Sequence, residues 1–159
     1  MAKHKKRSKS SREAGPEHEL PGGFWRQVVA VLMIVLSIVM VMTWFGSGGS
    51  LLNNFHRASL FCIGYASYAV PVILVYLAVK IFRAVANRLP IAIWIASVIM
   101  ILWLAGLFGL PTLNQPNPTG GLIGAGLNAL AIQILTPSVA AFIYAVLIFI
   151  TGIFILQVS

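Results

Sequence analysis

Residues 91–110 read IAIWIASVIMILWLAGLFGL, a run of twenty residues without a charged side chain. About 20 consecutive apolar residues form a helix long enough to cross the roughly 30 Å hydrocarbon core of a bilayer. The run lies between Pro90 and Pro111. Proline favours the start of a helix and cannot continue one beyond its end. The stretch therefore predicts one complete transmembrane helix.

Three further apolar stretches predict the remaining membrane spans, over residues 25–45, 65–82 and 138–156. Pro71 lies near the start of the second of these and predicts a kink there. A cleaved signal peptide is the alternative for the first stretch, but its apolar core exceeds the usual 7–15 residues. We therefore expect an all-α integral membrane protein with four transmembrane helices in one membrane domain, residues 24–157.

The composition excludes a water-soluble enzyme. The 159 residues are 59% hydrophobic and only 9% charged, with a formal net charge of +8, whereas soluble domains carry about 25% charged residues. The three acidic residues, Glu13, Glu17 and Glu19, all precede residue 20, and Cys62 is the single cysteine. Carboxylate dyads, Ser-His-Asp triads and multi-cysteine metal sites need residues that the rest of the chain lacks. We therefore expect no catalytic residue, metal or cofactor.

Two shorter apolar stretches, residues 51–63 and 122–135, predict short interfacial helices on the outer side of the membrane. Each follows a glycine pair and precedes a helix break, at Gly64 and Pro137 respectively. Because each then leads into a span, the two halves of the chain resemble a parallel repeat. Similar helical hairpins without a duplication remain the alternative.

Basic residues predict the orientation, because lysine and arginine concentrate on the cytoplasmic side of membrane proteins. The tail, residues 1–23, is polar enough to be disordered, and the first outer connection carries only Arg57. Both termini are therefore expected in the cytoplasm. The tail could instead bind nucleic acid, although no aromatic residue is interleaved to stack on bases. The residues to which we assign this lipid and topology role are Lys3, Lys5, Lys6, Arg7, Lys9, Arg12, Arg26, Lys80, Arg83 and Arg88.

Glycines suggest where helices approach closely. Gly106 and Gly109 are three residues apart and face nearly the same side of the third span. Gly120 and Gly124 have the spacing of a small-residue contact, and simple turn chemistry is the alternative. We expect these four glycines to take part in helix packing.

Three short stretches are typical of one known group of membrane domains: GGLIGAGL at residues 120–127, LAIQIL at 130–135 and YAVP at 68–71. Through these stretches the chain resembles the N-terminal four-helix membrane domain of the FtsK/SpoIIIE family of DNA translocases, which implies a multi-pass protein of the bacterial inner membrane. The resemblance covers roughly residues 25–157. It implies a membrane anchor at the division septum, in which a linker leads to a hexameric ATPase that moves DNA during chromosome segregation.

The resemblance also implies that copies associate, as hexamers, and that division-site proteins are possible partners. No G-x-x-x-x-G-K-[ST] run is found, so we expect the motor to be absent from this chain, which is a fragment or a product cut at the linker. Contact with DNA would then occur only through a motor. Two alternatives remain: a small transporter or channel subunit, and a standalone membrane scaffold. The spans place no ionisable Asp, Glu, Lys, Arg or His at mid-depth, which disfavours a transporter.

Overall fold

A computed structural model describes residues 24–46, 49–83, 91–113, 115 and 118–157 of the chain. Helices are the only regular elements in these ranges, which confirms the predicted all-α class. The elements, in chain order, are α1 (Phe24–Trp44), α2 (Gly49–Ile63), the 3-10 helix η1 (Gly64–Tyr68), α3 (Val70–Arg83), α4 (Ile91–Gly109), the 3-10 helix η2 (Leu110–Thr112), α5 (Gly121–Ala131) and α6 (Pro137–Gln157).

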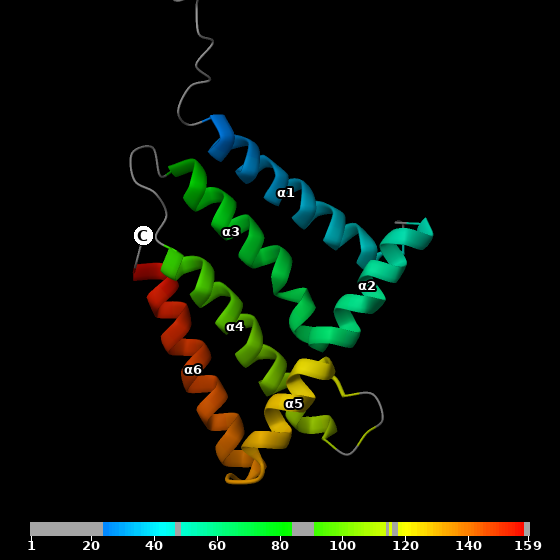
Figure 1. Ribbon diagram of the computed structural model, residues 1–159, viewed down its shortest axis with the longest axis vertical. Coiled ribbons are helices and arrows are strands. Elements are labelled where there is room, and N and C mark those ends of the chain that lie inside the picture. Colours follow the sequence, from blue (N-terminus) through cyan, green and yellow to red (C-terminus); the bar gives the residue numbers. More distant parts are fainter. Residues whose placement is uncertain (1–23, 47–48, 84–90, 114, 116–117, 158–159) are drawn as a thin grey trace, which may run out of the picture.

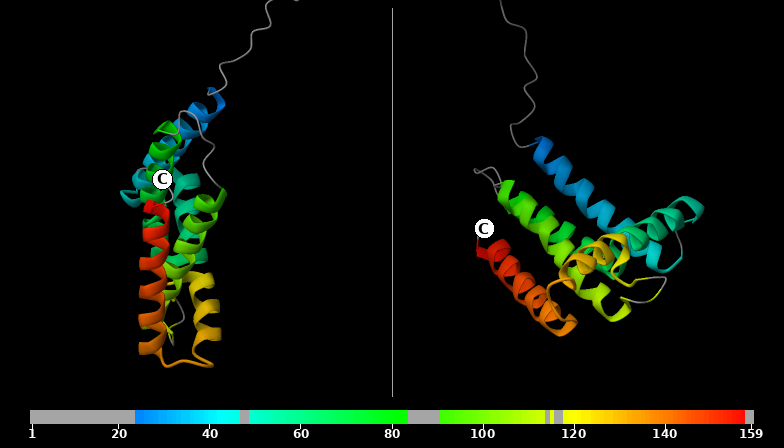
Figure 2. Two further views of the ribbon diagram at one scale, coloured as in Figure 1. Left: turned by 90° about the vertical axis from the view of Figure 1, so that its left-hand side faces the viewer. Right: turned by 60° about the horizontal axis from the view of Figure 1, so that its bottom comes forward.

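Four helices, α1, α3, α4 and α6, follow one another across the molecule (Figure 1). The molecule is thin in the perpendicular view (Figure 2). α1 packs on α3, and α4 packs on α6, so the chain forms two helical hairpins. α1 and α6 are the two edges of this layer. The hairpins are joined where η1 contacts α4 and where α2 contacts α5.

The layer has two ends. α1 begins, α3 ends, α4 begins and α6 ends at one of them, which we name the tail end (Figure 1). α2 and α5 lie at the opposite end, named the junction end. The chain therefore passes between the two ends four times in alternating directions.

Three elements are long and apolar enough to cross a membrane alone: Phe24–Trp44, Ile91–Thr112 and Pro137–Gln157. The fourth candidate is the pair Gly49–Tyr68 and Val70–Arg83, bent by 66° at the break between them. The sequence predicts one kinked span over residues 65–82. The structure instead divides that stretch into η1 and α3, and the break at residue 69 lies two residues before Pro71.

The local sequence permits this division. α2 ends at Ile63, and Gly64 follows with a φ of +59°, the left-handed conformation that commonly terminates a helix. Pro71 lies in the first turn of α3, where its missing N–H would have no partner within that helix. The chain can therefore turn at Gly64 and begin a new helix at residue 70.

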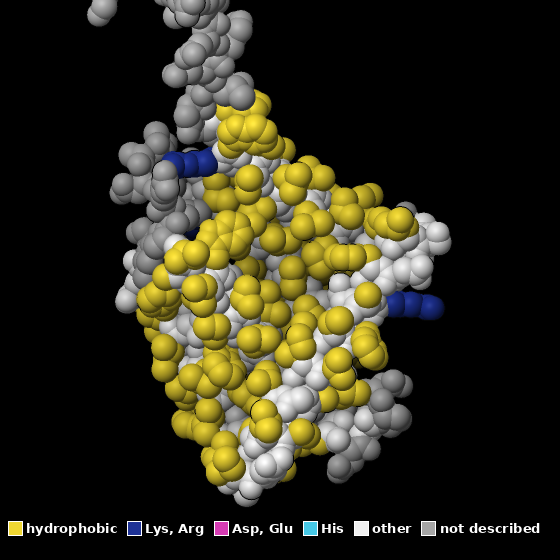
Figure 3. Space-filling model, viewed as in Figure 1, with side chains coloured by type: hydrophobic (Ala, Val, Ile, Leu, Met, Phe, Trp, Pro, Cys, Tyr) yellow, Lys and Arg dark blue, Asp and Glu magenta, His cyan; other side chains and the backbone are white. Residues whose placement is uncertain are grey.

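Each hairpin has its own small core. Ala30 and Met33 of α1 pack with Leu77 and Ala78 of α3, and Ile93 of α4 joins this cluster. A second buried cluster contains Leu110, Ala140 and Tyr144. Most other large apolar side chains stay exposed, and Figure 3 shows hydrophobic side chains over most of the face in view. Such a surface suits lipid rather than water.

The two short helices begin alike. Gly49 starts α2 with a φ of +67°, and Gly121 starts α5 with a φ of +66°. α5 is shorter than the stretch 122–135 predicted from sequence, because residues 132–135 form turns before α6. The shared left-handed glycine is a structural likeness between the two halves at corresponding places.

Candidate functional site

α5 lies against α4 through glycines. A Cβ atom placed on Gly120 or on Gly124 would lie 2.2 Å from the carbonyl oxygen of Ala105 in α4. The Cα atom of Gly109 would be 2.6 Å from the Cβ on Gly120. Three of the four glycines singled out in the sequence, Gly109, Gly120 and Gly124, therefore lie in one contact where the two backbones meet. Gly106 differs, because its neighbour is the ring of Tyr144 in α6.

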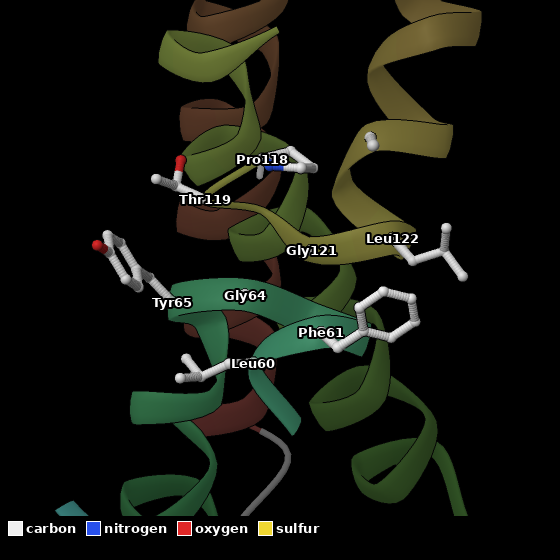
Figure 4. Close-up of a pocket in the computed structure, with 9 residues that line it drawn as sticks. Leu60, Phe61, Gly64, Tyr65, Pro118, Thr119, Gly121 and Leu122 are labelled. Carbon is white, nitrogen blue, oxygen red and sulfur yellow. The ribbon is translucent and has the colours of Figure 1, made fainter. Parts of the chain in front are cut away.

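A second glycine contact joins the two halves of the chain at the junction end. A Cβ on Gly64 would lie 2.0 Å from the carbonyl oxygen of Thr119, and a Cβ on Gly121 would lie 2.5 Å from the amide nitrogen of Gly64. The backbone N–H of Tyr65 donates a hydrogen bond to the Thr119 carbonyl, 2.8 Å away. Figure 4 shows Gly64 and Gly121 facing each other between η1 and the start of α5. We name Gly64, Gly120, Gly121 and Gly124 together the glycine junction.

Thr112 and Thr119 form hydrogen bonds in the connection that leads into α5. The backbone N–H of Thr119 donates to the hydroxyl of Thr112 over 2.8 Å, and the two threonine hydroxyls lie 2.9 Å apart. The hydroxyl of Thr119 also donates to the carbonyl of Phe108. These bonds hold the residues before Gly120 against the end of α4.

Asn128 is a buried polar residue that sequence reasoning missed. Its side chain is fully buried, and its Nδ2 donates to the Gly106 carbonyl over 2.9 Å. Its Oδ1 has no hydrogen-bond partner in the structure. One signal was available: Asn128 lies four residues after Gly124, which places both on the same face of α5.

Two open grooves flank α5. One, of about 480 Å³, lies between α2 and α5, where the exposed side chains of Phe61 and Leu122 border it (Figure 4). The other, of about 520 Å³, lies towards η2 and the start of α6, and its polar side chains are Gln115 and Gln133. The described residues that line the two grooves include no Asp, Glu, His, Lys, Arg or Cys, and their hydroxyl groups are those of Tyr65 and Thr119. No base lies beside these hydroxyls in the linings to activate them as nucleophiles.

Hydroxyl groups within the helices bond mostly to backbone carbonyls. Ser97 donates to Ile93 at 2.8 Å, and Thr151 donates to Leu147 at 2.7 Å. The hydroxyl of Ser37 in α1 instead crosses to the Pro71 carbonyl of α3, 3.0 Å away. The buried hydroxyl of Ser67 differs, since it has no hydrogen-bond partner among the described residues. The hydroxyls of Ser37, Ser97 and Thr151 donate to backbone carbonyls and do not offer their protons to a polar pathway.

Three of the predicted lipid-contacting cations lie in described helices, all near the tail end. Arg26 is in the first turn of α1, and Lys80 and Arg83 are in the last turn of α3. Arg57 of α2 is exposed at the other end of the layer. The remaining candidates lie outside the described residues: Lys3, Lys5, Lys6, Arg7, Lys9, Arg12 and Arg88.

Metal-binding side chains do not gather in the described ranges, where no group of three or more His, Cys, Asp or Glu residues occurs. His56 of α2 lies edge-on to the ring of Tyr68, with the ring centroids 6.2 Å apart. Cys62 is exposed on the same helix. The arrangement described above is therefore one of helix contacts and surface charge.

Comparison with known proteins identifies the family. Residues 34–159 match the family described as the 4TM region of DNA translocase FtsK/SpoIIIE. No curated protein and no solved structure matched the chain. The matched region is the membrane part of these translocases and not their motor, and it includes α3, α4, α5 and α6 complete. Because the match covers most of the sequence, the chain belongs to the FtsK/SpoIIIE family through its four-helix membrane region, as its resemblance predicted.

Proposed function

We propose that this chain is the membrane-anchoring and oligomerisation domain of an FtsK-like DNA translocase that acts in bacterial cell division and chromosome segregation. The observation that carries the proposal is the family match over residues 34–159. The exposed apolar surface of the helices supports an anchor, because such a surface is stable only among lipid tails.

The distribution of cations supports an orientation. Arg26, Lys80 and Arg83 lie at the tail end, whereas Arg57 is at the other end. Since cytoplasmic connections carry the excess of basic residues, the tail end faces the cytoplasm and both termini lie there. α2 and α5 then lie at the outer interface of the inner membrane. The basic tail adds about 1 kcal/mol of lipid attraction per cation near an anionic leaflet.

The flat layer supports association between copies. α1 and α6 form opposite edges and expose apolar side chains in the middle of each helix, such as Val35 and Val146. A contact between α1 of one copy and α6 of the next would be heterologous, and heterologous contacts form a ring when the rotation between copies closes. A ring of six copies would gather attached motors in one plane and raise their effective concentration.

Disulfide cross-linking tests the association. We would replace Cys62 with Ser, introduce Val35→Cys and Val146→Cys together, and oxidise membranes from cells that express the full chain. The expected result is a ladder of cross-linked species that ends at six copies. Each single-cysteine variant is the matched control, because it can form dimers at most. A doubly substituted chain that stays monomeric contradicts the proposed edge contact.

Fluorescence microscopy tests the role in division. A fluorescent protein fused after the C-terminal residue should collect at the division septum of growing bacteria. A matched fusion to an unrelated four-span membrane protein should remain evenly distributed around the cell. An even distribution of both fusions contradicts an independent septal anchor.

A further inference from the structure

The end of α6 is held by a side chain from the other half of the protein. The hydroxyl of Tyr76 in α3 donates a hydrogen bond to the carbonyl of Ile155, 2.8 Å away and 79 residues distant in sequence. α6 ends at Gln157, so the Ile155 carbonyl has no amide partner within that helix. Tyr76 therefore satisfies one of the acceptors that every helix leaves open at its C-terminus.

The position of this bond sets the depth at which α6 ends. Tyr76 lies seven residues before the end of α3, and Ile155 lies two residues before the end of α6. The bond therefore fixes the last turn of α6 beside the middle of α3 and not beside the end of that helix. Ile155 is buried, so its carbonyl gains more from a protein donor than one that already faces water.

Lys80 supports the tyrosine from the next turn of α3. Its Nζ lies 5.2 Å from the centroid of the Tyr76 ring. A cation in this position is attracted to the ring face. Lys80 also lies in the last turn of α3, where a positive charge favours the C-terminus of that helix. Lys80 thus has a packing role beside its role in topology.

We infer that Tyr76 is a positioning residue, a clasp that fixes where α6 ends relative to α3. The glycine junction ties the two halves together at the junction end, and the Tyr76 clasp ties them at the tail end. The inference rests on the proposed function in one respect only. If a motor domain is joined to α6, its force would act on a helix end that is bound to both hairpins.

Distances between spin labels test the clasp in the full chain, reconstituted in lipid nanodiscs with Cys62→Ser as background. One label pair, at Phe82→Cys and Gln157→Cys, reports the tail end. A second pair, at Leu51→Cys and Leu130→Cys, reports the junction end. Tyr76→Phe removes only the hydroxyl. Tyr144→Phe is the matched control, because it also removes only a hydroxyl from a buried tyrosine, and ring carbons of Tyr144 are the atoms nearest to a Cβ placed on Gly106.

Tyr76→Phe should broaden the 82–157 distance distribution by several ångströms and leave the 51–130 distribution unchanged. Tyr144→Phe should change neither. An 82–157 distribution that matches the parent overturns the inference. So does an equal broadening of both pairs, since Tyr76 would then stabilise the whole fold and not the end of α6. Septal localisation does not enter either result, so failure of the clasp and failure of the proposed function remain distinguishable.

Discussion

At Gly124, where α5 crosses α4, the hydrogen atom of glycine fits between the helices and the methyl group of alanine would not. Gly124→Ala would place a Cβ 2.2 Å from the Ala105 carbonyl, a backbone atom that cannot rotate away. Overpacking of this kind costs about 1–3 kcal/mol. We therefore expect Gly124→Ala to lower the free energy of unfolding by that amount, measured by denaturant titration in mild detergent.

Gly126 supplies the matched control on the same helix, since a Cβ there meets nothing within 4 Å. Alanine has the higher helix propensity, by about 1 kcal/mol, so Gly126→Ala should be neutral or slightly stabilising. Equal losses for Gly124→Ala and Gly126→Ala would contradict the close α4–α5 contact.

Alanine substitutions at Gly121 and Gly49 distinguish the cost of a strained backbone from the cost of a steric clash. Both glycines have a left-handed φ, but a Cβ on Gly121 would lie 2.5 Å from the Gly64 nitrogen, whereas a Cβ on Gly49 meets nothing within 4 Å. Gly49→Ala should cost about 1–2 kcal/mol from conformation alone, and Gly121→Ala should cost clearly more. Thermal unfolding followed by circular dichroism compares the two, and equal shifts would show that the halves do not meet at Gly121.

Some of these contact residues can be predicted from the sequence, and others cannot. Gly120 and Gly124 are visible as a pair because their spacing places them on one helix face. Gly64 and Gly121 are 57 residues apart in sequence. They contact each other only in the folded chain, so the sequence does not reveal their contact. Asn128 looks like one polar residue in an apolar helix, and its bond to Gly106 depends on how α4 and α5 cross.

At the scale of elements, one hydroxyl joins α1 to α3. Ser37 donates to the Pro71 carbonyl across the helix pair, whereas Ser97 donates to Ile93 within its own helix, and both serines are buried. Hydrogen bonds between membrane helices average about 0.6 kcal/mol, with a maximum near 1.7. Ser37→Ala should lose stability within that range, measured by unfolding in bicelles.

Ser97→Ala is the control for that measurement and should change the stability less, because no bond between helices is lost. A larger loss for Ser97→Ala than for Ser37→Ala would be inconsistent with a cross-helix role for Ser37.

The extents of the elements differ in how well sequence predicts them. The stretches 25–45, 91–110 and 138–156 lie within one residue of α1, α4 and α6 at each end. Bilayer thickness and flanking proline residues dictate such lengths. The second span is not predicted in detail, because a 3-10 helix, a left-handed glycine and a 66° bend depend on contacts with residues 119–121.

At the scale of the whole molecule, the alternation of direction follows from the basic residues and the number of apolar stretches. The arrangement in a flat layer with α1 and α6 at its edges does not follow, since apolar helices of similar composition could pack in any order. Short contacts at the glycine junction and at Tyr76 select this order, and those contacts connect residues far apart in sequence.

The central claim is that the bent pair α2–η1–α3 contributes one crossing, made by α3, so that the chain crosses the membrane four times with the tail end in the cytoplasm. Alkaline phosphatase is active only outside the cytoplasm and tests this directly when fused after Gly46, Asn87, Gln115 or Gln157. We expect activity after Gly46 and Gln115 and none after Asn87 and Gln157. Activity after Asn87 would contradict the account, because α3 would then fail to return the chain to the cytoplasm.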